Sequence, residues 1–266
     1  MKTKLYAIIL FLLAINLDQT IQAQEIKVLT YNIYHGEKHY TNGESNLQQI
    51  VQVINEYKPD FVAMQEVDSM TNRTAGFNSG IRKDLVKELA KLTGMHGFFG
   101  KAMDYDNGGY GEGLLSRFPA KAVVHPLVTP KSGEGRALIT VEHQFPNGKT
   151  VVFGGTHLCH EFKENRIAQA KQVADILTNM GKPVIVGGDF NIVPGSEPYR
   201  AITTKLDDAA VRFGTPELTF PYKAPKIRLD YIFLDKSSHW KVKDVKVIKS
   251  SDASDHLPVL VTLELQ

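Results

Sequence analysis

Residues 183–191 read PVIVGGDFN, an apolar run that passes into two glycines and then into Asp189, Phe190 and Asn191. A short, unbroken apolar run is typical of a strand that is buried on both faces of a sheet. Polar groups that follow such a strand lie where open α/β sheets bind ligands. The segment therefore predicts a buried strand with a candidate site at its end.

The same arrangement recurs along the chain, because other apolar runs also end in short polar clusters. These clusters are TYN at 30–32, QE at 65–66, TH at 156–157, GGDFN at 187–191, RLDY at 228–231 and SDH at 254–256. Clusters that follow several strands of one fold predict a single shared site.

The spacing of apolar residues predicts amphipathic helices in residues 46–57, 81–92 and 161–180. Further strands are predicted at 114–116, 120–124, 137–143, 150–153, 231–234, 241–248 and 258–263. Asn147 and Gly148 supply the turn of a hairpin between two of these strands. The order of elements favours an α/β fold in which two sheets pack together between helices, and it leaves other α/β arrangements open.

The first 23 residues have the layout of a secretory signal peptide. Lys2 and Lys4 precede the apolar residues 5–15, and Ala23 offers a small residue before a cleavage point. The apolar stretch is too short to span a bilayer comfortably, and a buried first helix is the alternative interpretation. We expect export to the periplasm or the medium, with residues 24–266 as one mature domain and no transmembrane segment in it.

Charge and cysteine content narrow the class of function. The chain carries a net charge of +2, whereas proteins that hold long nucleic acid through its phosphates are usually more basic. Cys159 is the only cysteine, so no intramolecular disulfide can form, and we expect its side chain to be buried. We expect a monomer.

Seven segments together resemble the endonuclease/exonuclease/phosphatase superfamily of DNase I-like, metal-dependent phosphoesterases, and secreted bacterial members in particular. They are TYN at 30–32, MQEVD at 64–68, YGEGLLSRFP at 110–119, THL at 156–158, GGDFN at 187–191, RLDYIF at 228–233 and SDHLP at 254–258. The resemblance covers residues 25–263. It implies a four-layered α/β sandwich of two mixed β-sheets flanked by helices.

The resemblance implies that Glu66 is the principal metal ligand, with Asp255 and Asn32 nearby in the metal shell. Oxygen ligands suit Mg²⁺ or Mn²⁺, whereas one cysteine and scattered histidines do not make a zinc site. We expect one metal ion, because Tyr34 stands where some nucleases of the superfamily carry a carboxylate.

Catalytic roles are also implied by the resemblance. Asp189 positions or deprotonates the attacking water, and Asn191 points its amide at a phosphoryl oxygen and at Asp189. Asp230 orients His256 and raises its pKa, so that the imidazolium donates a hydrogen bond to the phosphate. His157 assists the leaving group or holds a non-bridging oxygen. From the residues alone, the turn after Asp189 could equally be an Asx turn.

Substrate-binding roles are implied for Asn32, Asn191, Tyr110 and Arg136. The residues leave open whether Arg136 clamps phosphate or pairs with an acidic neighbour. Many members of the superfamily carry Asn where Glu112 stands here, so we expect Glu112 to meet a cationic or hydroxyl-rich group of the substrate.

The sequence thus predicts an exported, Mg²⁺-dependent enzyme that hydrolyses a phosphodiester or phosphomonoester of a lipid head group or a small organic phosphate. An extracellular nuclease is the alternative, and it would need a basic stripe beside the site. The only dense basic cluster is formed by Lys241, Lys243, Lys246 and Lys249, on a predicted edge strand. A non-catalytic binding protein is the alternative of another class, although every residue of the catalytic motifs is present.

Overall fold

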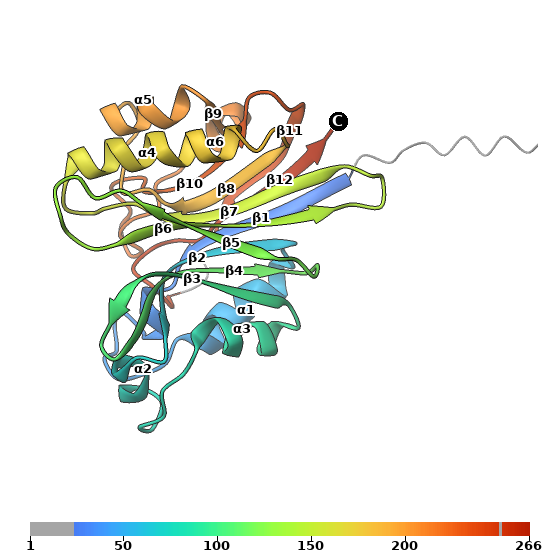
Figure 1. The fold of residues 1–266 in the computed structure, drawn as a ribbon. Coiled ribbons are helices and arrows are strands. Elements are labelled where there is room, and N and C mark those ends of the chain that lie inside the picture. The colour runs from blue at the N-terminus through green and yellow to red at the C-terminus, as the bar shows by residue number, and fades with distance from the viewer. Residues whose placement is uncertain (1–23, 250–251) are drawn as a thin grey trace, which may run out of the picture.

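The computed structural model describes residues 24–249 and 252–266, so the predicted signal peptide lies outside the described residues. The chain forms two mixed six-stranded sheets that pack against each other, with helices on the outer faces (Figure 1). This arrangement confirms the predicted four-layered α/β sandwich. Among the described residues, no helix is both long enough and apolar enough to cross a membrane.

The first sheet has the spatial order β11 (Trp240–Val247), β12 (Val259–Leu265), β1 (Gln24–Asn32), β2 (Phe61–Ser69), β4 (Gly108–Ser116) and β3 (His96–Tyr105). The second has the order β5 (Ala122–Leu127), β6 (Arg136–Gln144), β7 (Thr150–His157), β8 (Val184–Asp189), β10 (Asp230–Asp235) and β9 (Leu206–Asp208). One neighbouring pair in each sheet is parallel, β1 with β2 and β7 with β8. Asn32 at the end of β1 donates a hydrogen bond to Asp189 at the end of β8, so both parallel pairs end at one edge of the sandwich.

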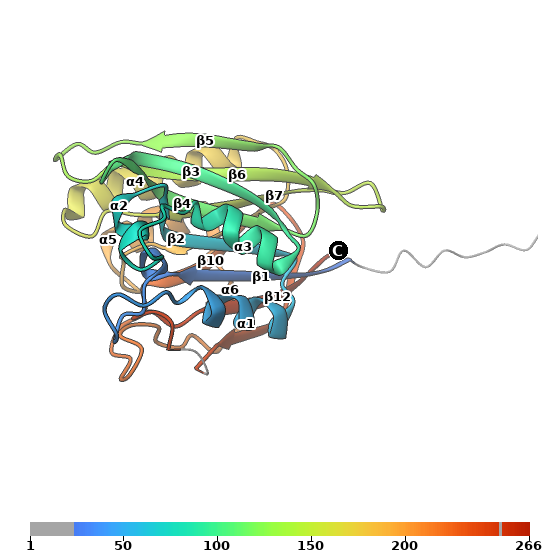
Figure 2. The same cartoon turned by 90° about the horizontal axis from the view of Figure 1, so that it is seen from below.

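Helices cover both outer faces of the sandwich (Figures 1 and 2). The first sheet is covered by α1 (Leu47–Tyr57) and α3 (Leu85–Thr93), and the second by α4 (Lys163–Thr178) and α5 (Glu197–Thr203). The short helices η1 (Tyr34–Gly36), α2 (Asn72–Gly76) and α6 (Ala209–Phe213) lie in connections.

The burial of β8 explains the unbroken apolar run at residues 183–186. Ile185 packs into the core between the two sheets, whereas Val184 and Val186 pack beneath α4. Both faces of the strand are therefore buried, as its unbroken apolar sequence predicts. The sheets also approach closely beside this strand, because a Cβ atom on Gly155 would lie 2.6 Å from Leu114 Cδ2.

The predicted helices and strands are all present, with shifted ends. For example, α3 begins at Leu85 rather than Ile81, because the Asp84 side chain accepts a hydrogen bond from the Lys87 backbone N–H and caps the helix there. The sequence pattern did not predict β3, β9, η1, α2, α5 or α6. An edge strand such as β3 leaves much of its surface exposed, so its sequence lacks the alternation that marks a half-buried strand. Cys159 is buried, as expected.

Candidate active site

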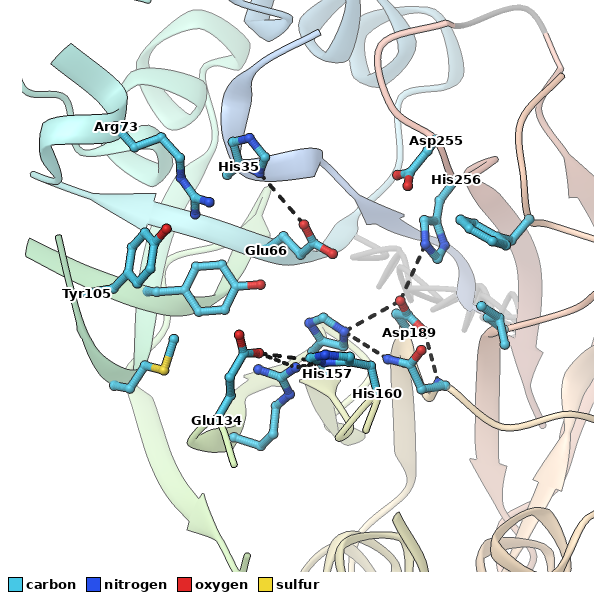
Figure 3. A pocket seen from close by; sticks show the side chains of 16 residues that line it. His35, Glu66, Arg73, Tyr105, Glu134, His157, His160, Asp189, Asp255 and His256 are labelled. Carbon is cyan, nitrogen blue, oxygen red and sulfur yellow. Dashed lines mark hydrogen bonds and ion pairs between the residues drawn. The ribbon is translucent and has the colours of Figure 1, made fainter. Parts of the chain in front are cut away.

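Most of the predicted site residues line one cavity of about 430 Å³ at the edge where β1, β2, β7 and β8 end (Figure 3). The predicted residues that line it are Glu66, Tyr110, Arg136, His157, Asp189, Asn191, Asp255 and His256. Asn32 and Asp230 lie behind this wall, and each hydrogen-bonds to residues that form it. Segments from across the chain therefore meet at one place.

Glu66 enters the cavity from a β-bulge. Met64 pairs with Gly113 and Val67 with Gly111, so Gln65 and Glu66 together face one residue of β4. Glu66 has a φ of 56°, a left-handed conformation that is uncommon outside glycine. Bulges beside functional sites redirect a side chain out of the regular alternation, and this bulge accounts for the position of Glu66.

Neighbouring donors keep Glu66 ionised. Its Oε1 accepts a hydrogen bond from Asn32 Nδ2 at 3.0 Å, and His35 Nδ1 lies 3.8 Å from Oε2. Burial acts to raise the pKa of Glu66, but hydrogen bonds from His35 and Asn32 outweigh it and hold the value at about 2. Glu66 therefore carries a full negative charge at neutral pH.

Asn32 positions the carboxylates and does not face the cavity. Its Nδ2 also donates to Asp189 Oδ2 at 3.2 Å, and its Oδ1 accepts from the Tyr34 backbone N–H. The side chain is fully buried. The structure thus places Asn32 behind Glu66 and Asp189, and its roles in the metal shell and in substrate binding stay predictions.

Glu66 and Asp255 form the acidic pair best suited to a divalent cation. Burial, together with the nearby charge of Glu66, raises the pKa of Asp255. Two carboxylates that repel each other at one cavity are stabilised by a cation that both can contact, and oxygen donors suit a hard divalent ion. The residues therefore fit the expected metal.

A second buried cluster, formed by Asp189, Asp230 and His256, also brings potential ligand atoms together, all within 4.8 Å of one another. His256 Nδ1 lies 2.9 Å from Asp230 Oδ2, and Nε2 lies 3.6 Å from Asp189 Oδ2. Burial acts to lower the pKa of His256, but the two carboxylates outweigh it and raise the value to about 10. The two carboxylates hold the His256 ring between them, so this cluster can present a positive charge to the cavity.

Asp189 has the properties of a proton acceptor near neutral pH. Burial raises its pKa to about 7, although the His256 charge opposes the rise. Its Oδ1 accepts a hydrogen bond from the Asn191 backbone N–H at 2.9 Å, which confirms the Asx turn that the sequence left open. The Asn191 side chain does not reach Asp189 as predicted, because its Nδ2 donates to His157 Nε2 and to the Leu158 carbonyl oxygen, each at 3.0 Å.

His157 is uncharged in this environment. Burial and the positive charge of Arg136 lower the pKa of His157 well below its ordinary value. Its Nε2 lies 3.0 Å from Asn191 Nδ2, and an uncharged ring can accept a hydrogen bond there.

Glu112 does not reach the cavity, so the predicted contact between Glu112 and a substrate group is wrong. It lies two residues beyond Tyr110 on the same face of β4, deeper between the sheets, and its side chain is almost completely buried. There it accepts hydrogen bonds from the backbone N–H groups of Ala137 and His157, while burial raises its pKa to about 8. Arg136 pairs with Glu134 at 2.8 Å, which is the acidic neighbour that the sequence left as an alternative.

The cavity is also lined by residues that were not predicted as site residues: His35, Arg73, Met103, Tyr105, Glu134, His160, Phe220 and, from the RLDY cluster, Leu229. His35 directly follows the TYN cluster, and a φ of 45° turns it toward Glu66. Arg73 and Tyr105 belong to α2 and β3, short or exposed elements without a sequence signal. Only the fold brings these side chains to the site.

Comparisons with known proteins agree with this fold. A protein of Escherichia coli K12, the uncharacterized protein YbhP, is 27% identical over 93% of this chain and 99% of its own length. The solved structure of a mannosyl-6-phosphatase from Bacteroides thetaiotaomicron is similar with a TM-score of 0.72 and 20% identity, covering 90% of this chain and 99% of that one. The human Nocturnin catalytic domain, solved with a bound sulfate anion, is similar with a TM-score of 0.70 and 22% identity, covering 92% and 98% of the two chains. The sequence pattern of the endonuclease/exonuclease/phosphatase family matches residues 29–256, and the chain therefore belongs to this family.

Proposed function

We propose that the protein is a divalent-metal-dependent hydrolase that cleaves a phosphoester of a small organic molecule. The observation that carries the proposal is the meeting of an ionised Glu66, a proton acceptor at Asp189 and an imidazolium at His256 around one cavity. Hydrolysis of a phosphoester needs an oriented water, a proton acceptor for it and positive groups beside the phosphoryl oxygens.

Asp189 would accept the proton of the attacking water, since its pKa of about 7 suits a general base at neutral pH. His256 would donate from its imidazolium to a phosphoryl oxygen, while Asp230 holds the ring through Nδ1. Asn191 would position His157, because both of its amide hydrogens are used by His157 and Leu158.

Glu66 and Asp255 would hold the metal ion, for which we propose Mg²⁺ or Mn²⁺. A divalent ion bound there would neutralise charge on the phosphoryl oxygens and polarise the bond to be broken. Export is part of the proposal and rests on the layout of residues 1–23.

Charge pairing supports a small substrate over long nucleic acid. The two arginines that line the cavity, Arg73 and Arg136, each pair with a carboxylate. Of the basic cluster named in the sequence analysis, Lys243 pairs with Glu264, and the Lys246 ammonium lies over the Tyr57 ring. These cations are poor candidates for the continuous basic stripe that a nuclease would need.

The proposal is tested by assaying the purified protein with Mg²⁺ against plasmid DNA, sphingomyelin, phosphoinositides, a hexose phosphate and a chromogenic phosphodiester. We expect a small phosphoester to be hydrolysed with the highest kcat/KM. Efficient cleavage of DNA with a steep dependence on salt would instead identify a nuclease.

The charge on His256 gives a prediction for the pH profile. The carboxylates outweigh burial and raise its pKa to about 10, so activity that needs the imidazolium is present below this pH and is lost as pH rises through it. Asp230→Asn removes the closer carboxylate and should move the alkaline limb of kcat/KM to lower pH. The measurement is kcat/KM against pH at saturating metal, with the exposed Asp244→Asn as a matched control. An alkaline limb that stays in place in Asp230→Asn would contradict the assigned role of His256.

A further inference from the structure

The cavity extends beyond the groups proposed to act on phosphorus. On the side away from Asp189 and His256, Figure 3 shows Arg73 and Tyr105 above and Glu134 below, all facing the cavity. We call this side of the cavity, formed by Arg73, Tyr105, Glu134 and the adjoining His160, the distal end. None of these residues has a part in the hydrolytic step described above.

Arg73 offers a fixed hydrogen-bond donor at the distal end. Its Nε and Nη2 donate to the two oxygens of the fully buried Asp68, at 2.8 and 2.7 Å, and its guanidinium carbon lies 4.6 Å from the centre of the Tyr105 ring. Such a paired and stacked guanidinium is held in one orientation. Its Nη1 forms no hydrogen bond with any residue that the structure describes, so this nitrogen remains available to a ligand.

Glu134 offers a fixed acceptor across the cavity from Arg73. Its Oε2 lies 2.8 Å from Nη2 of Arg136, whose side chain is only 1% exposed and therefore immobile. The Glu134 side chain is 41% exposed, and within residues 24–249 and 252–266 no donor approaches its Oε1. This oxygen can accept a hydrogen bond from a ligand.

The charges at the distal end are balanced. Arg73 is compensated by Asp68, and Arg136 by Glu134. A second phosphate there would be repelled by Glu134 and would meet no uncompensated cation. A cationic group would be repelled by the two guanidinium groups of Arg73 and Arg136. A hydroxyl both donates and accepts, so neighbouring hydroxyls can bond to Arg73 Nη1 and Glu134 Oε1 together.

We propose that the distal end binds the organic part of the substrate and selects a neutral, hydroxyl-rich group about as large as one monosaccharide. This inference rests on the proposed phosphoesterase function and adds the substrate class to it. The cavity volume of about 430 Å³ is large enough for a phosphoryl group and one such ring.

The test compares kcat/KM of the full-length protein and of Glu134→Gln on a hexose 6-phosphate, a hexose 1,6-bisphosphate, phosphocholine and 4-nitrophenyl phosphate. The wild type should prefer the hexose monophosphate to the bisphosphate and to phosphocholine by at least about 10-fold. In Glu134→Gln, kcat/KM for the hexose monophosphate should fall by about 10- to 100-fold, the range for a hydrogen bond to a charged group, because the charged acceptor is lost. The value for 4-nitrophenyl phosphate should stay within about 3-fold, since that leaving group offers no hydroxyl to Glu134.

Glu161→Gln is the matched control, because Glu161 adjoins His160 but does not line the cavity. It should leave all four values unchanged. An equal loss on the hexose and nitrophenyl substrates in Glu134→Gln would show that Glu134 only supports Arg136, and would overturn the inference. A wild-type preference for the bisphosphate or for phosphocholine would overturn it too. Hydrolysis of 4-nitrophenyl phosphate without a preference for the hexose would refute the inference alone, whereas no hydrolysis of any phosphoester would refute the proposed function together with it.

Discussion

Replacing Asp189 by asparagine is expected to lower kcat by about 10²-fold or more and to change KM little. The substitution keeps the size and the planar shape of the side chain, but an amide cannot accept the proton of the attacking water. Burial raises the pKa of Asp189 to about 7, so the wild-type carboxylate is suited to this transfer near neutral pH. The measurement is initial rates at saturating metal on the best small phosphoester.

His256→Ala should behave differently from Asp189→Asn. It removes a positively charged hydrogen-bond donor that stabilises the bound substrate in part and the transition state more strongly. Both a fall in kcat and a rise in KM are therefore expected. Asp244→Asn, on the exposed strand β11, is the control for the aspartate substitution. Near wild-type turnover in Asp189→Asn would show that another group activates the water.

Removal of divalent metal is expected to abolish activity, and Mg²⁺ or Mn²⁺ is expected to restore it. Glu66→Gln should lower the affinity for Mg²⁺ by at least about 10-fold. The substitution removes the Glu66 carboxylate, which its pKa of about 2 keeps ionised at neutral pH. The shape of the side chain is retained, so the metal-free variant should melt at nearly the wild-type temperature. Calorimetric titration with Mg²⁺ and thermal unfolding of the metal-free protein measure these two quantities.

Glu56→Gln on the exposed face of α1 is the matched control for charge removal. Full activity after exhaustive chelation would refute the metal dependence. A large fall in the melting temperature of metal-free Glu66→Gln would assign Glu66 a structural role at the bulge instead.

The layered fold could be predicted because buried strands leave a strong signal in sequence. The apolar run at 183–186 is such a signal, since Val184 and Val186 pack on one face and Ile185 on the other. By contrast, β3 is an edge strand, and its exposed side chains follow no apolar pattern. Local sequence also did not show that Asp84 begins α3, a boundary that depends on one capping hydrogen bond.

The site could be predicted where its residues follow buried strands. Asp189 and His157 end two neighbouring parallel strands, so their proximity follows from the topology. The bulge that redirects Glu66 and the left-handed conformation of His35 depend on tertiary contacts that no local pattern encodes. Arg73 reaches the cavity only because Asp68 and Tyr105 hold it there, and Glu112 was misplaced because its burial between the sheets depends on long-range packing.

The position of β12 has a consequence for the biosynthesis of the protein. This strand lies between β1 and β11, and only Leu257 and Pro258 separate it from His256. Until residues 256–265 have been synthesised, β1 lacks one partner and His256 is missing from the cavity. β1 and β12 are far apart in the sequence, and pairing between such distant segments costs loop-closure entropy and slows folding. A polypeptide exported as proposed would benefit from this delay, because a translocation channel accepts chains that have not yet folded. The same delay leaves one edge of β1 unpaired, and an unpaired strand edge is prone to pair with other chains until β12 covers it.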